Sequence, residues 1–247
     1  MNLTNNRPYF LGIDEVSGEL NQDCDKSLKN EYIAHFASCF KAKTIRVWLK
    51  MDELFKVNED DELEFIPNEI LKLHEYLALL KEHGVERFLL LDWGFVYPYG
   101  YKAQDHWTVP DPKNETDMYR RFLLVQEKVR FEIARNFLDI EYYEPTNEPD
   151  LGGSFVHKNG FVNAKEKEPY IYTRNEISEI VCDLSYYCNR GVKRANKDAK
   201  VLLPSFCNFE YAPKYLEQIY LNIESGKFPR FTNKSKNVND YFQLLSF

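Results

Sequence analysis

The sequence lacks several features that mark large classes of proteins. None of its 247 residues falls in a run of the roughly 18 apolar residues that a membrane-spanning helix needs, and its first residues contain no apolar signal-peptide core. Positive charge is in deficit, because the formal net charge is −7, whereas nucleic-acid-binding surfaces are strongly basic. We therefore expect no membrane and no nucleic-acid partner, and a cytoplasmic location.

Motifs for nucleotides, metals and disulfides are also absent. No GxGxxG follows the first predicted strand, and no GxxxxGK followed by Ser or Thr occurs, so a dinucleotide fold and a P-loop have no support. The five cysteines are odd in number and show no CxxC spacing, which favours buried free thiols. His106 has no second His or Cys nearby at ligand spacing. The sequence thus predicts no cofactor and no metal.

The chain does contain a regular alternation of two patterns. Short segments rich in apolar and aromatic residues are typical of strands, and segments with apolar residues every three or four positions are typical of amphipathic helices. The predicted strands lie at about 9–14, 44–50, 87–93, 140–148, 200–206 and 240–247, and the predicted helices at about 28–41, 67–84, 122–137, 175–192 and 212–226. This alternation of six strands and five helices predicts parallel strands joined by helical crossovers.

The expected fold class is α/β, with a TIM (β/α)8 barrel as the architecture. A barrel of this kind occupies about 250 residues as one domain, so we expect residues 1–247 to form a single domain. In the first predicted helix, Leu28, Tyr32, Phe36 and Phe40 lie on one face, the apolar face of an amphipathic helix. The acidic segment 58–62 is expected to be a solvated surface insertion.

The stretch 140–150 is the most informative part of the chain. It begins as a strand-like run rich in Ile and Tyr and ends in Asn147-Glu148-Pro149. Pro149 cannot donate to a sheet and pushes the preceding residue towards extended geometry, so we expect Glu148 at the last step of the strand. The carboxyl ends of strands carry the chemistry in α/β folds. Taken alone, however, the tripeptide favours the simpler interpretation of a polar turn.

The longer stretch from Glu144 to Pro149, Glu-Pro-Thr-Asn-Glu-Pro, resembles the fourth-strand motif of clan A glycoside hydrolases, usually Glu-x-Trp-Asn-Glu-Pro. The resemblance implies that Glu148 is the general acid/base and that Asn147 binds the sugar 2-hydroxyl beside the bond to be cut. Thr146 departs from the pattern, because the family often has Trp there, and any stacking by that ring is lost. The resemblance covers most of the chain, but its specificity rests mainly on this motif.

The resemblance and the aromatic content suggest further site residues. Clan A enzymes often carry an Arg on the second strand that hydrogen-bonds the nucleophile carboxylate, and Arg46 matches it by order and context; the alternative is an outward-facing arginine. Asp92 and Trp93 close the third predicted strand, and a long aromatic loop follows, which is typical of a functional segment. We expect Asp92, Trp93, Tyr97 and Trp107 to bind substrate; the alternative is that the rings pack the loop onto the barrel.

The resemblance implies a retaining mechanism, which needs a second carboxylate about 5–5.5 Å from the first. In clan A this nucleophile is a Glu at the end of strand seven, and the sixth predicted strand lies at the end of this sequence, so we expect strands seven and eight to be missing from residues 1–247. Two functions stay open. One is a glycosidase that hydrolyses O-glycosyl bonds, with its acid/base half here. The other is a non-catalytic carbohydrate-binding barrel fragment.

Overall fold

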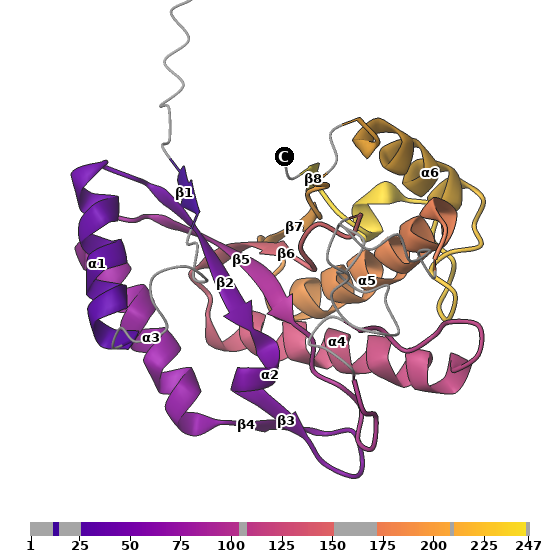
Figure 1. Cartoon of the computed structure of the whole chain (residues 1–247), viewed down its shortest axis with the longest axis horizontal. Helices are drawn as coiled ribbons and strands as arrows, with labels where there is room; N and C mark the ends of the chain where they lie inside the picture. Colours follow the sequence, from indigo (N-terminus) through magenta and orange to yellow (C-terminus); the bar gives the residue numbers. More distant parts are fainter. Residues whose placement is uncertain (1–11, 15–25, 104–107, 151–171, 208–209, 246–247) are drawn as a thin grey trace, which may run out of the picture.

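A computed structural model of the chain describes residues 12–14, 26–103, 108–150, 172–207 and 210–245 (Figure 1). Its main sheet has six parallel strands in the order β1-β2-β5-β6-β7-β8, which confirms the predicted parallel strands. These are β1 (Gly12–Asp14), β2 (Thr44–Lys50), β5 (Arg87–Gly94), β6 (Ile140–Glu144), β7 (Lys200–Leu203) and β8 (Leu244–Leu245). The strands follow one another in chain order, as in a TIM barrel, and the described part of the barrel is open between β1 and β8.

Helices connect successive strands of this sheet, as the alternation predicted. They are α1 (Lys26–Cys39), α3 (Pro67–Glu82), α4 (Thr116–Asn136), α5 (Arg174–Ala195) and α6 (Ala212–Glu224). Figure 1 shows α1 and α3 beside the first strands and α4, α5 and α6 beside the later ones. A short helix, α2 (Met51–Leu54), and a 3-10 turn at Val238–Asp240 were not predicted. None of the described helices combines the length and the apolar character needed to cross a bilayer.

The acidic segment 58–62 is the turn of a small antiparallel hairpin, in which Glu59, Asp60 and Glu62 are exposed as predicted for a surface insertion, whereas Asp61 is partly buried. The hairpin consists of β3 (Phe55–Val57) and β4 (Leu63–Phe65). The carboxylate of Asp61 accepts hydrogen bonds from Arg121 Nε at 2.6 Å and Nη2 at 2.7 Å, and from the backbone N–H of Tyr99 at 3.0 Å. Arg121 lies on α4, so the hairpin is fixed to the helix layer.

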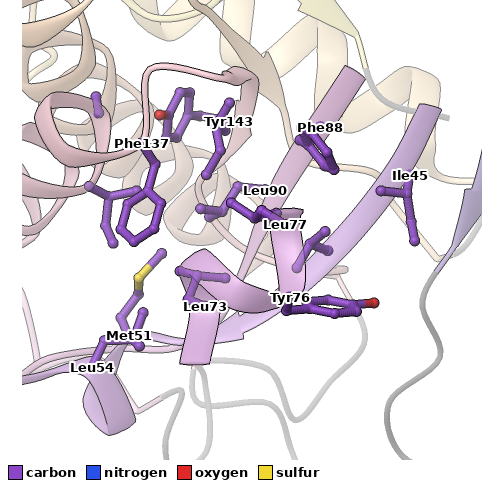
Figure 2. Close-up of a cluster of buried hydrophobic side chains, with 14 of the residues drawn as sticks. Ile45, Met51, Leu54, Leu73, Tyr76, Leu77, Phe88, Leu90, Phe137 and Tyr143 are labelled. Atoms are coloured by element: carbon purple, nitrogen blue, oxygen red, sulfur yellow. The ribbon is translucent and has the colours of Figure 1, made fainter. Parts of the chain in front are cut away.

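The helix-covered face of the sheet forms the main hydrophobic core. Figure 2 shows side chains of α3, β5 and the end of α4 pointing into one cluster. Labelled there are Ile45, Met51, Leu54, Leu73, Tyr76, Leu77, Phe88, Leu90, Phe137 and Tyr143. A second cluster joins α4, α5 and α6. Close packing on this face leaves little freedom to the strands, whose carboxyl ends are thereby held at fixed positions.

The first helix buries a different face from the one that its aromatic residues suggested. Tyr32, Phe36 and Phe40 are 56%, 40% and 54% exposed, whereas Ala34 and Ala37 are fully buried. Among the described side chains of α1, two of the three buried ones are alanines and the third is Ile33, and close packing on this face leaves no room for rings. The side chain of Leu28, the remaining residue of the predicted face, is outside the described part of the structure.

Candidate active site at the carboxyl edge of the sheet

The candidate site is built where β2, β6 and the segment after β7 end. A β-bulge in β6 decides which side chains point towards it, because Phe88 pairs with Ile140 but Leu89 pairs with Tyr142, so that Glu141 is skipped. After the bulge, Tyr143 points into the helix-covered core and Glu144 points to the opposite side. We call the side of the sheet that carries Glu144 and Arg46 the inner face.

Glu144 is the buried centre of the site. Its Oε2 accepts hydrogen bonds from Arg46 Nε at 3.0 Å and Nη2 at 2.8 Å. Its Oε1 accepts from the backbone N–H of Ser205 at 2.9 Å and from Ser205 Oγ at 3.0 Å. Glu144 is fully buried, and a buried carboxylate is tolerated only when it is paired and hydrogen-bonded in this way. The ion pair therefore joins β2, β6 and the segment after β7 into one rigid unit.

Arg46 extends this network to Asn147. Its Nη2 donates to Asn147 Oδ1 at 3.2 Å, which leaves the amide N–H groups of Asn147 as donors on the other side. A hydrogen bond from the Asn147 side chain lowers the pKa of Glu148, so the two motif residues contact each other directly. The structure thus brings together three residues that were predicted from the sequence, Arg46, Asn147 and Glu148.

Glu148 has an unusual backbone conformation. β6 ends at Glu144, and Glu148 has a φ of +38°, so the prediction of an extended residue at the last step of the strand is wrong. Left-handed geometry is uncommon for a residue other than glycine, and the following Pro149 disfavours helical geometry still further. Strain of this kind concentrates at functional sites, where the surrounding structure holds it.

The surroundings of Glu148 favour its protonated form. Partial burial raises the pKa of Glu148 above its usual range, and the negative charge of Asp150 raises it further, whereas Arg46 and Asn147 act in the opposite direction. Asp150 Oδ1 accepts a hydrogen bond from the backbone N–H of Cys207 at 2.8 Å, which holds this carboxylate beside Glu148. A half-buried carboxyl with a raised pKa is suited to donate a proton.

Asp92 was predicted to bind substrate, and the structure corrects this assignment. Its carboxylate is fully buried on the helix-covered face, where it forms an ion pair with Arg130 of α4 and accepts from the backbone N–H of Gly94 at 3.1 Å. Burial raises the pKa of Asp92 to about 6, and the charge of Arg130 opposes the shift. The parity of β5 explains the difference, since Asp92 shares its side of the strand with Leu90 of the core.

The predicted aromatic residues divide into three cases. Trp93 is partly exposed and its ring contacts that of Trp48, a residue that the sequence analysis did not select. Tyr97 packs against Phe122 of α4, with ring centroids 6.0 Å apart, and therefore anchors the loop to the helix layer. Trp107 lies outside the described residues. In the described part of the chain, no three His, Cys, Asp or Glu side chains come together as metal ligands.

Solved structures of glycoside hydrolases share this fold. A trimodular endoglucanase of the GH5_4 subfamily matches 87% of the chain with a TM-score of 0.52 at 11% identity. A GH5-4 broad specificity endoglucanase from an uncultured bacterium matches 77% with 0.51 at 11%, and a glycoside hydrolase family 5 enzyme from Prevotella bryantii matches 89% with 0.50 at 11%. The chain spans 36%, 51% and 73% of these proteins, respectively. No family model and no curated protein sequence matches it.

Proposed function

We propose that this chain is the acid/base part of a retaining glycoside hydrolase, with Glu148 as the general acid/base and a carbohydrate as the substrate. The observation that carries the proposal is the hydrogen-bonded series Glu144–Arg46–Asn147–Glu148. It starts at the fully buried carboxylate of Glu144, paired with the partly exposed Arg46, and ends at a half-buried carboxyl with a raised pKa. The TIM-barrel fold shared with glycoside hydrolases supports the same conclusion, and we propose that the chain forms a single domain.

The proposed chemistry needs two proton transfers at Glu148. In the first step, protonated Glu148 gives its proton to the glycosidic oxygen as the bond from that oxygen to the anomeric carbon breaks, and a carboxylate nucleophile bonds to the anomeric carbon. In the second step, Glu148 takes a proton from a water whose oxygen bonds to the anomeric carbon, while the bond from that carbon to the nucleophile breaks and the sugar leaves. Asn147, oriented through Arg46, offers its amide to the sugar 2-hydroxyl. The resemblance assigns the nucleophile to a seventh strand, and a bond between it and Arg46 stays a prediction.

The alternative function is carbohydrate binding without hydrolysis. It is favoured by the second carboxylate of the site, Glu144, whose two oxygens are occupied by Arg46 and Ser205. A carboxylate held in this way is a poor nucleophile, because attack would break a buried ion pair. The two functions differ in whether Glu148 transfers a proton during turnover.

Variants of Glu148 test the proposal through the leaving group. Glu148→Gln keeps the shape of the side chain but removes proton transfer, which contributes roughly 10²–10⁴ in rate. In a form of the protein that includes the seventh strand, we expect this loss for substrates with poor leaving groups and a much smaller one for aryl glycosides whose leaving group needs no proton. Azide should restore turnover of an activated aryl glycoside to Glu148→Gly and form a glycosyl azide.

Glu141→Gln, the same change at an exposed carboxyl of β6, provides the control and should behave like the unchanged protein. Equal losses for good and poor leaving groups, with folding and binding intact, would remove Glu148 from the acid/base role. Sugar binding without any turnover in a form that includes the seventh strand, with and without azide, would establish the alternative function.

A further inference from the structure

A pair of tryptophans lies beside the hydrogen-bonded series of the site. The ring centroids of Trp48 on β2 and Trp93 on β5 are 4.4 Å apart with their planes inclined by 42°, and both side chains are partly exposed. Trp48 is on the inner face because it is two residues after Arg46 on the same strand. The guanidinium carbon of Arg46 lies 5.6 Å from the centroid of the Trp48 ring, and Arg46 also donates to Asn147. The indole pair is thus one side chain away from Asn147.

The strand register supplies a second observation. Leu49 pairs with Asp92 and Lys50 pairs with Gly94, so Trp93 is the extra residue of a β-bulge. Asp92 and Gly94 are buried on either side of it, yet Trp93 keeps part of its ring exposed. Bulges are over-represented next to active sites, where they redirect a side chain. Trp93 lies at this bulge on the opposite side from Asp92, and its ring contacts that of Trp48 at the carboxyl edge where the candidate site lies.

We propose that Trp48 and Trp93 form an aromatic platform that binds a second sugar ring of the substrate, next to the ring whose bond lies at Glu148. The inference rests on the proposed function and specifies its substrate as an oligosaccharide or polysaccharide. An indole face is flat, apolar and electron-rich, and it can cover the C–H face of a pyranose while the hydroxyl groups stay hydrated. Arg46 lies over one ring of the platform and donates to Asn147 of the site, so the platform and the site share one side chain.

Fluorescence can test the platform without any turnover. The chain has three tryptophans, so Trp107→Phe leaves Trp48 and Trp93 as the emitters. We expect cellotriose, mannotriose or xylotriose to change the emission of this variant and to protect it from acrylamide quenching, whereas the matching monosaccharides at equal concentration should not. Failure of all three trisaccharides to change emission or quenching would overturn the platform.

Substitution of the platform gives an independent measurement. In Trp48→Leu and Trp93→Leu, the preference for the trisaccharide over the monosaccharide should fall on the order of tenfold, as expected for the loss of an aromatic contact. Tyr32→Leu, which removes an exposed ring of α1 outside the site, serves as the matched control, and thermal unfolding checks that the variants are folded. If they do not fold, the quenching experiment decides the question alone.

The failure of the platform and the failure of the proposed function can be told apart. An unchanged trisaccharide preference in folded Trp48→Leu overturns the platform and leaves the role of Glu148 untouched. A platform that binds trisaccharides in a chain whose Glu148→Gln variant loses no proton transfer overturns the acid/base role, and the chain is then a carbohydrate-binding protein.

Discussion

The acidity of Glu148 depends on a few identifiable neighbours. Burial and Asp150 raise its pKa, and Arg46 and Asn147 lower it. Because Arg46 is shared with Glu144, most of its charge is already compensated, and its effect on Glu148 is moderated. Asp150 is therefore the charged neighbour whose removal should change Glu148 most clearly.

Asp150→Asn should lower the pKa of Glu148. The substitution removes a negative charge that disfavours ionisation of Glu148, while the amide oxygen can still accept from the backbone N–H of Cys207. Titration of the Glu148 carboxyl carbon by NMR measures the change directly, and any activity that needs protonated Glu148 should then decline at a lower pH. Asp139→Asn, an exposed control that pairs with Lys81, should leave the titration unchanged. An unchanged or raised pKa in Asp150→Asn would contradict the electrostatic account.

Residues of the site were predictable from the sequence only where a motif marks them. Asn147 and Glu148 stand in a recognisable pattern, and Arg46 matches by strand order. Ser205 was missed, because its contact with Glu144 joins residues 61 positions apart and follows from strand adjacency. The inward direction of Glu144 depends on the bulge at Glu141, for which the sequence carries no separate signal.

Helix α1 shows how burial differs from apolar periodicity. A row of aromatic residues at helical spacing predicts a buried face, but the buried residues in the described part of α1 are Ile33, Ala34 and Ala37, which lie between them. Propensity and periodicity identified this helix correctly, whereas the size of the side chains that fit beneath it decided its orientation. The apolar pattern does not show how much room lies beneath each position, so it could not predict which face of α1 is buried.

Substitutions on the two faces of α1 should differ sharply. Phe36→Ser removes a ring that is 40% exposed, and it should change the free energy of unfolding by no more than about 0.5 kcal/mol, as is usual for surface positions. Ala37→Leu inserts three carbons at a fully buried position and should cost about 1–3 kcal/mol through overpacking. Urea denaturation of both variants gives the comparison. A large loss in Phe36→Ser would mean that its ring is covered in solution.

In the whole molecule, one face of the sheet packs against the helices and the inner face carries the candidate site. Alternation of strands and helices was enough to predict the parallel sheet and the TIM-barrel fold, since each strand is buried beneath a helix and each crossover has one hand. What the alternation could not show is which face each polar residue occupies. Asp92 stands at a strand end as a catalytic acid would, and only its partner Arg130, on a helix 38 residues later, identifies it as part of the core.

Asp92 and Arg130 provide a test of how the sheet and the helix layer are joined. Removing one member should leave a buried charge unpaired, so Asp92→Leu and Arg130→Met should each lower the free energy of unfolding by about 3–5 kcal/mol. The double variant should lose much less than the sum, because no charge is left buried and Arg130 Nε has no hydrogen-bond partner among the described residues to lose.

The pH dependence of the free energy of unfolding of these variants tests the direction of the Asp92 pKa shift. The pKa of Asp92 rises from 3.8 to about 6 on folding, so the folded chain binds its proton more tightly than the unfolded chain does. This contribution to stability is present below pH 3.8 and is lost as the pH rises to about 6. Asp183 is likewise buried, with its pKa raised to about 6, so the slope should become smaller in the double variant without disappearing. Urea denaturation at several pH values measures it, and an unchanged slope in the double variant would show that Asp92 does not titrate in the folded core.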